Sequence, residues 1–457
     1  MDNLQAQLTQ LMRDLQLEDA PAGGSVVVYH KGELIAQANA GYAVPDTPWD
    51  KDTLSLNFST GKGVLVTLIH ILVCNGLLDY DQPLAHYWPE FAANGKQDIT
   101  LRQVLTHQAG LFNIQSVTDT AEDMVHWHQM LSRVEAMSPR VPANQQATSA
   151  YSALVSGWVL GGLIEKVTNQ TLNEVIDEYL AKPLGIEGSL YFGVPQQKLT
   201  DVATLTKNFE HFETFIGVKE DSQSDLSAPK KRSAKPKLRS DNEQTLQIYQ
   251  NLMAYPCWQA AMKQQAGSEQ QDQASNKAIL NTLDIANLYF DMSSIQMQDF
   301  KYALVPAGRS GFNYYTADAL MAKIPAANNV ASADALAKMY AMLANKGRWQ
   351  GKQLISEQVF QQLSQINVKG PDAIMPAADP HSMQWRLGYH RVFSRCYSSE
   401  ELSSAFGHMG YNGSVAWCDF ERELAVAFVH NYDVVMSTDI RQFAITETIL
   451  QWLDQQQ

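Results

Sequence analysis

The chain has 457 residues, of which 45% are hydrophobic and 18% are charged. This composition is typical of a globular protein with a sizeable core and excludes a chain that is disordered throughout. The 34 Lys and Arg residues against 48 Asp and Glu residues give a net charge of −14 at pH 7. Because binding to a phosphate backbone depends on cations that displace counterions, no nucleic-acid partner is expected.

The N-terminal part of the chain predicts a helix followed by two strands. Residues 2–15 place four leucines and a methionine close to helical spacing, which predicts an amphipathic helix. Residues 25–30 and 33–40 are apolar, partly alternating runs joined by Lys31 and Gly32, so they predict a β-hairpin. The helix would then cover one face of this hairpin.

The middle of the chain has a different pattern of apolar residues from the N-terminal part. From residue 60 to about 190 the pattern is mainly helical, with predicted helices over 64–78, 101–105, 153–167 and 172–180. Residues 219–245 contain almost no apolar side chain and include six Lys or Arg residues between Lys230 and Arg239. This stretch predicts a disordered basic surface loop, with docking to an acidic partner or a membrane as the alternative.

The C-terminal part mirrors the N-terminal part. Three short strands are predicted at 405–410, 413–420 and 424–431, followed by a helix over 440–453. The pattern favours an α/β protein of the α+β type, in which both chain ends build one antiparallel sheet around an inserted helical region. Three parts are predicted. Residues 1–58 and about 301–457 form a sheet domain, residues 59–200 form a mainly helical domain, and residues 201–300 form an insertion.

Two serines are followed by a lysine three positions later, Ser59 in STGK and Ser227 in SAPK. Ser227 lies in the polar stretch with a proline inside the tetrad, so no rigid scaffold would hold the pair together. Ser59 lies just before an apolar helix, where Lys62 would face the same side one turn later. A desolvated lysine can accept the proton of a serine, which makes Ser59 a candidate nucleophile; a capping serine beside a solvated lysine is the alternative.

Seven segments of the chain match sequence motifs of one protein superfamily, and they follow one another in the same order as in that superfamily. They are FSTGK (58–62), GLLDYDQPLAHYWPEF (76–91), ITLRQVLTHQAGL (99–111), YSALVSGWVLGGLIEKVTNQTL (151–172), KPLGI (182–186), ASADALAKMYAMLANKG (331–347) and FGHMGYNGS (406–414). With them the chain resembles the serine β-lactamase and penicillin-binding-protein superfamily, specifically its class C-like branch, to which family VIII carboxylesterases belong. The resemblance implies a β-lactamase/transpeptidase-like fold with the nucleophile on the first helix of the helical domain.

The resemblance also implies roles for individual residues. Ser59 matches the family nucleophile, and Lys62 matches its partner on the helix. Tyr151, in YSA, matches a tyrosine that acts as base toward the serine and as acid toward the leaving group. A buried structural role for this tyrosine is the alternative.

The HMG segment stands at the place of the family's KTG element, on a strand that lines the site. His408 and Gly410 are its outer residues, and the backbone N–H groups of Tyr411 and Ser59 would form the oxyanion hole. Ala153 replaces the asparagine of the family's YxN element, and His408 replaces a lysine that favours a carboxylate. Both departures weaken the case for β-lactam or peptidoglycan substrates.

The sequence-based prediction is a serine hydrolase that cleaves a small-molecule ester or amide through an acyl-enzyme on Ser59. D-amino-acid peptidase, penicillin-binding or weak β-lactamase activity is one alternative, and a catalytically weak binding or assembly module is another. No cofactor is expected, and no metal, since His126 and His128 would point away from each other on a helix. The start of the chain lacks signal-peptide features and no segment is long enough for a membrane span, so a cytoplasmic location is expected.

Overall fold

The computed structural model describes residues 2–16, 22–205, 255, 259, 282–308, 311–378 and 382–456. The predicted basic loop at 219–245 lies outside the described residues, as does most of the predicted insertion. In the described ranges, no helix has both the length and the apolar character that crossing a membrane requires.

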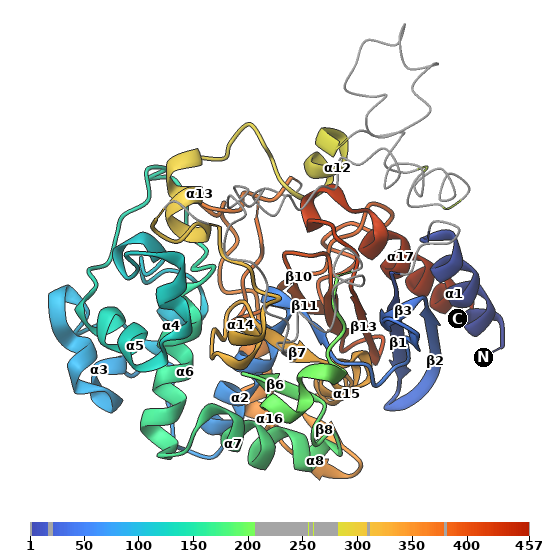
Figure 1. The fold of residues 1–457 in the computed structure, drawn as a ribbon, viewed down its shortest axis with the longest axis horizontal. Helices are drawn as coiled ribbons and strands as arrows, with labels where there is room; N and C mark the ends of the chain where they lie inside the picture. The colour runs from blue at the N-terminus through green and yellow to red at the C-terminus, as the bar shows by residue number, and fades with distance from the viewer. Residues whose placement is uncertain are drawn as a thin grey trace, which may run out of the picture.

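A six-stranded antiparallel sheet joins the two ends of the chain (Figure 1). Its order is β10-β11-β12-β13-β1-β2, so the N-terminal hairpin continues the C-terminal strands through the β1–β13 pair. The strands are β1 (Gly24–His30), β2 (Glu33–Ala40), β10 (His390–Arg391), β11 (Ala405–Met409), β12 (Val415–Asp419) and β13 (Leu424–His430). The predicted α/β fold class, with a sheet built from both chain ends, is therefore confirmed.

Helices cover both faces of this sheet. On β1, Val26 and Val28 belong to the core that also contains the apolar face of α1 (Asp2–Asp14) and of α17 (Arg441–Asp454). Val27 and Tyr29 belong to the core formed with α2 (Lys62–Cys74) and α15 (Ala333–Ala344). Figure 1 shows α1 and α17 side by side at the edge where both termini lie. Burial on both faces explains why β1 and β13 read as nearly continuous apolar runs.

The inserted helical region packs around two apolar helices, α2 and α6 (Val155–Thr168), most of whose residues are buried. The predicted helix at 64–78 ends earlier, at Cys74, because Gly76 takes a positive φ of 73° that stops it. The other helices of the region are α3 (Leu84–Tyr87), α4 (Leu101–Leu105), α5 (Trp127–Ala136), α7 (Leu172–Ile176) and α8 (Lys182–Leu184). The region also contains four short 3₁₀-helical segments and one π-helical turn: η2 (Pro89–Gly95), η3 (Ile114–Ser116), η4 (Ala121–Val125), η6 (Gln196–Asp201) and the π-helical η5 (Asp177–Ala181).

A small antiparallel sheet supports the start of α2. Its order is β5-β7-β6, formed by β5 (Ser55–Leu56), β7 (Asn329–Ala331) and β6 (Leu190–Phe192). The turn η1 (Phe58–Gly61) follows β5 and leads directly into α2. The remaining elements are β3 (Tyr42–Val44), β4 (Thr47–Pro48), α12 (Thr282–Tyr289), α13 (Met297–Leu304), α14 (Ala317–Met321), β8 (Arg348–Trp349), β9 (Lys352–Gln353), α16 (Glu357–Ser364) and η8 (Met436–Thr438).

Candidate active site

Ser59 lies in the turn η1, between the small sheet and α2. Phe58, immediately before it, has a φ of 47°, a strained backbone conformation for a bulky side chain. The Phe58 ring is held by Tyr314, Tyr315 and Tyr411, with ring centroids 5.3, 6.1 and 5.7 Å away. This packing fixes the turn and leaves the Ser59 side chain only half-buried.

Lys62 meets Ser59 as the sequence spacing predicts. Its Nζ lies 2.8 Å from Ser59 Oγ and donates a hydrogen bond of 2.7 Å to the Ala326 carbonyl oxygen. The Lys62 side chain is buried, and burial lowers its pKa well below the ordinary value. The lowered pKa favours the neutral amine, whose lone pair can take the serine proton.

Tyr151 also lies beside Ser59 and Lys62. Lys62 Nζ is 5.1 Å from the centre of the Tyr151 ring, and the phenol hydrogen-bonds with the Ser59 side chain. Burial raises the Tyr151 pKa above its ordinary value of 10, although the bond to Ser59 acts in the opposite direction. The structure thus brings Ser59, Lys62 and Tyr151 together, with the tyrosine in its phenol form.

A cluster of aromatic rings packs around Tyr151. Trp385 stacks on it with ring centroids 5.4 Å apart and an angle of 19° between planes, while the His107 ring meets its edge at 5.0 Å. His390 and His408 complete the cluster and lie 4.7 Å from each other. We call these five residues the aromatic wall: His107, Tyr151, Trp385, His390 and His408.

The three histidines of the aromatic wall are electrically neutral at neutral pH. Burial lowers the pKa of His107 to about 3 and that of His390 to about 4. The pKa of His408 is lowered well below 6.5, first by burial and then by His390 and Lys62. The wall therefore presents no cation to the site.

His408 stands on β11, where the sequence places it. Its Nδ1 donates to the Met409 carbonyl oxygen at 3.1 Å, so Nε2 carries a free lone pair. Among the described residues, this buried Nε2 has no hydrogen-bond partner. His408 can therefore accept a hydrogen bond from a bound molecule or a water, but it does not attract a carboxylate.

Gly410 allows β11 to approach the nucleophile turn. A Cβ at this position would lie 2.4 Å from the Asn57 carbonyl oxygen, well inside van der Waals contact. Thr60 joins the same two segments, because its Oγ1 donates to the Ser414 carbonyl oxygen at 2.9 Å. Tyr411 follows with a 44% exposed side chain and, like Gly410, lines the pocket in front of Ser59.

The pocket in front of Ser59 is open to solvent, and the empty space within it and at its mouth is about 370 Å³. Its walls are mostly apolar and rich in methionine, and the described residues that line it include no Asp, Glu, Lys or Arg. They are Ser59, Tyr151, Leu304, Met375, Met383, Trp385, His390, His408, Met409, Gly410, Tyr411 and Met436. The site is therefore suited to an uncharged, largely apolar substrate.

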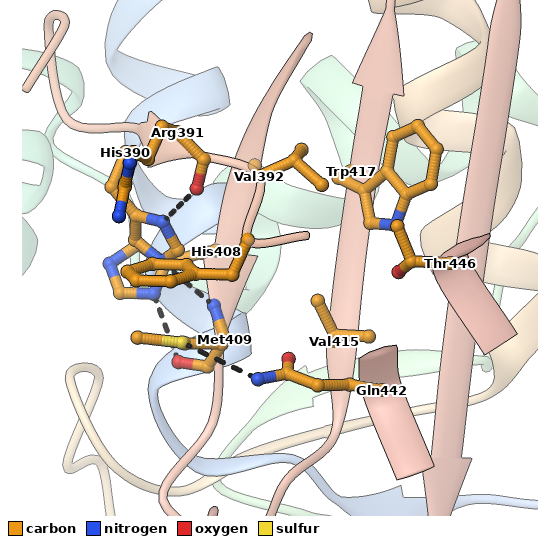
Figure 2. Close-up of a pocket in the computed structure, with 11 residues that line it drawn as sticks. His390, Arg391, Val392, His408, Met409, Val415, Trp417, Gln442 and Thr446 are labelled. Atoms are coloured by element: carbon orange, nitrogen blue, oxygen red, sulfur yellow. Dashed lines mark hydrogen bonds between the residues drawn. The ribbon is translucent and has the colours of Figure 1, made fainter. Parts of the chain in front are cut away.

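A second, smaller pocket lies behind β11 (Figure 2). Figure 2 shows His390 and His408 together at one side of it, with Gln442 and Thr446 of α17 at the other. His390 Nδ1 donates to the Arg391 carbonyl oxygen at 2.6 Å, and Nε2 accepts from the Met409 N–H at 3.1 Å. These two bonds fix one neutral tautomer of His390 and hold β10 against β11.

Three residues of the site carried no signal in the sequence: Asp372, Trp385 and His390. They come from loops and a two-residue strand far from the matched motifs, and they meet the site only through tertiary packing. His107, in the matched segment ITLRQVLTHQAGL, also contacts the Tyr151 ring directly. In the described part of the chain, no group of three or more His, Cys, Asp or Glu side chains is placed to hold a metal ion.

The chain belongs to the beta-lactamase family, whose model matches residues 8–447. A curated relative, the "Esterase/beta-lactamase LipL" of Mycobacterium tuberculosis, is 29% identical over 414 residues, which cover 90% of this chain and 77% of the relative. These matches identify the protein as a serine hydrolase.

Solved structures show the same fold. A penicillin-binding-protein homologue from Caulobacter crescentus superposes with a TM-score of 0.66 at 24% identity, covering 98% of this chain and 97% of the homologue. A family VIII carboxylesterase superposes with a TM-score of 0.64 at 22% identity, with the same coverage of both chains. The fold is β-lactamase/transpeptidase-like, as the sequence resemblance predicted.

Proposed function

We propose that the protein hydrolyses an uncharged carboxylic ester, or a small amide, through an acyl-enzyme on Ser59. The observation that carries this proposal is the 2.8 Å contact between Ser59 Oγ and Lys62 Nζ at the inner end of an apolar pocket. Lys62 is buried and its pKa is well below the ordinary value, so it can be neutral when the substrate arrives. An activated serine beside a neutral base is the arrangement that nucleophilic acyl transfer needs.

The proposed reaction has two halves. Ser59 Oγ attacks the carbonyl carbon while Lys62 takes the serine proton, and the backbone N–H groups of Ser59 and Tyr411 stabilise the tetrahedral oxyanion. Tyr151 donates its proton to the leaving alcohol and recovers one from Lys62. A water molecule then attacks the acyl-enzyme and gives up a proton to this pair of side chains. The pair returns that proton to Ser59 Oγ as the bond to the acyl group breaks, which releases the acid and free Ser59.

The walls of the pocket support an uncharged substrate. A carboxylate on the substrate would need a cation or several donors, but His408 is neutral, and no lysine or arginine lines the pocket among the described residues. Ala153, which stands where related enzymes hold a substrate amide, offers no polar atom. These features favour an ester over a β-lactam or a peptide with a free carboxylate.

Weak β-lactam hydrolysis is a second candidate, since the curated relative carries both names, esterase and beta-lactamase. β-Lactam hydrolysis would use the same nucleophile as ester hydrolysis, but it would also require recognition of the substrate carboxylate. Comparison of kcat/KM for nitrocefin and for p-nitrophenyl butyrate separates the two candidates. The proposal predicts that the ester value is higher by at least about 100-fold, which corresponds to roughly 2.7 kcal/mol of differential transition-state binding.

The direct test is a panel of p-nitrophenyl esters with the purified protein and two variants. Ser59→Ala should remove turnover above the uncatalysed rate, whereas Ser116→Ala, which changes an exposed serine of η3, should leave it unchanged. Turnover that survives Ser59→Ala would reject Ser59 as the nucleophile. Absence of turnover for every ester and amide tested would favour the binding-module alternative.

A further inference from the structure

We infer that Asp372 is a positioning residue of this hydrolase: it holds Tyr151 and Trp385 in the geometry that proton transfer to the leaving group requires. This inference rests on the proposed function, because it assigns Tyr151 a proton-transfer role. Asp372 itself does not line the pocket and acts only through its neighbours. Its role follows from the hydrogen bonds that its carboxylate accepts.

One carboxylate oxygen holds the backbone. Asp372 Oδ1 accepts from the N–H of Tyr151 at 3.2 Å, of Ile374 at 2.9 Å and of Met375 at 3.0 Å. The first of these bonds reaches across 221 residues of sequence to the backbone of Tyr151. The carboxylate thus ties the loop after Pro371 to the segment that carries the tyrosine.

The other carboxylate oxygen holds side chains. Asp372 Oδ2 accepts from Ser149 Oγ at 2.7 Å and from the indole N–H of Trp385 at 3.1 Å. The Trp385 ring in turn stacks on the Tyr151 ring, with 19° between the two planes. Asp372 therefore restrains Tyr151 twice, through its backbone N–H and through the tryptophan that packs against its ring.

Only a carboxylate satisfies all five donors. Asp372 is 1% exposed and four of its five hydrogen bonds are buried, so water does not replace a lost bond at those four donors. Asparagine has a single acceptor oxygen and would turn its NH₂ group, or its oxygen, toward the wrong set of donors. The site is built around two acceptor atoms.

The charge of Asp372 also acts on the Tyr151 proton. The titratable groups that face Tyr151 are Lys62, His107, His408 and Asp372. Burial lowers the pKa values of both histidines well below the ordinary 6.5, so both are uncharged at neutral pH. The negative charge of Asp372 adds to the effect of burial and raises the Tyr151 pKa, which keeps the phenol protonated as a donor.

Asp372→Asn tests the positioning role. With Oδ1 kept toward the three backbone amides, the new NH₂ group faces the Trp385 N–H, donor against donor, and the tryptophan must move. We expect kcat for an ester with a poor leaving group, such as ethyl butyrate, to fall by about 10- to 100-fold with a smaller change in KM, since the loss falls on proton transfer to the leaving group. Loss of the negative charge lowers the Tyr151 pKa, so the alkaline fall of kcat should begin at lower pH than in the wild type.

A second substitution makes the test independent of folding. Trp385→Phe keeps an aromatic ring against Tyr151 and removes the indole N–H, so the donor-against-donor conflict disappears in the double variant Asp372→Asn/Trp385→Phe. We expect this double variant to recover at least about fivefold of the lost kcat while the alkaline shift, which depends on charge alone, remains. If Asp372→Asn caused only a general structural defect, the losses of kcat in the two single variants would add in the double variant, and no kcat would be recovered.

Asp419→Asn is the matched control. Asp419 is also buried and accepts bonds from a serine, Ser404, and from the backbone N–H groups of Glu421 and Arg422, but it lies at the other end of the β11–β12 pair from Gly410. It should lose stability without a change in the pH profile of kcat. A wild-type pH profile and an unchanged kcat in Asp372→Asn would overturn the inference; turnover that survives Ser59→Ala would overturn the proposed function instead.

Discussion

The two sides of the site are built in different ways. The nucleophile side comes from one short segment, in which Ser59 and Lys62 are three residues apart on η1 and α2 and lie within 2.8 Å of each other. The aromatic wall is collected from segments around residues 107, 151, 385, 390 and 408. The first side supplies reactive groups, and the second holds one phenol among neutral rings. The difference teaches that reactivity here is local in sequence, whereas its positioning depends on tertiary packing.

Lys62→Met should have the largest effect and tests the nucleophile side. Methionine fills a similar volume but cannot accept a proton, so we expect kcat to fall by about 10³-fold. Since burial already works against the charge of Lys62 and lowers its pKa well below the ordinary value, removal of that charge should leave the thermal midpoint within a few degrees of the wild type. Steady-state kinetics and thermal unfolding, measured together, check both parts. A variant that retains more than about a tenth of kcat would show that another group takes the serine proton.

Tyr151→Phe tests the aromatic wall without disturbing its packing. The ring that stacks on Trp385 stays, and only the hydroxyl beside Ser59 is lost. We expect kcat to fall by about 100-fold for an ester with a poor leaving group. For p-nitrophenyl esters, whose leaving group needs no proton, the loss should be several-fold smaller. Equal losses for both kinds of ester would contradict a proton donor at this position.

Gly410→Ala tests the contact between β11 and the nucleophile turn. A methyl group would meet the Asn57 carbonyl oxygen at 2.4 Å, so the backbone that carries the Tyr411 N–H must shift. We expect a loss of about 10-fold or more in kcat, because an oxyanion donor would be displaced. Gly311→Ala is the matched control, since a Cβ there has nothing within 4 Å. Similar kinetics for the two variants would count against the proposed oxyanion hole.

The smallest effect concerns the pH dependence of stability. His107 is buried with a pKa of about 3, below its ordinary value of 6.5, so the unfolded chain binds more protons below pH 6.5. Its contribution to the free energy of unfolding is present above pH 6.5 and is lost as pH falls from there toward 3, by up to about 1.4 kcal/mol per pH unit.

His107→Asn isolates this contribution. Asparagine tolerates the φ of 57° at this position and can still accept from the Ser152 N–H, which now bonds to His107 Nδ1 at 3.3 Å. Urea unfolding at pH 7 and pH 5 should show a shallower loss of stability in the variant than in the wild type. Parallel pH dependence in the two proteins would contradict a neutral, buried His107.

The sequence was sufficient for the fold and for the local part of the site. The apolar runs at both ends predicted the strands that pair as β1 and β13, and the i, i+3 spacing predicted the contact of Ser59 with Lys62. It did not predict Asp372 or Trp385, because no local pattern marks a buried acceptor whose donors lie 221 and 13 residues away. The 47° φ of Phe58 was equally invisible, since tertiary ring packing holds it there.

The measurement that tests the central claim most directly is mass spectrometry of the protein after reaction with a fluorophosphonate ester. The account predicts a single covalent adduct, mapped to the peptide that contains Ser59, and no adduct in Ser59→Ala. Labelling should also slow strongly in Lys62→Met, because the serine proton then has no acceptor. An adduct on a different residue, or equal labelling of the wild type and Ser59→Ala, would contradict the account.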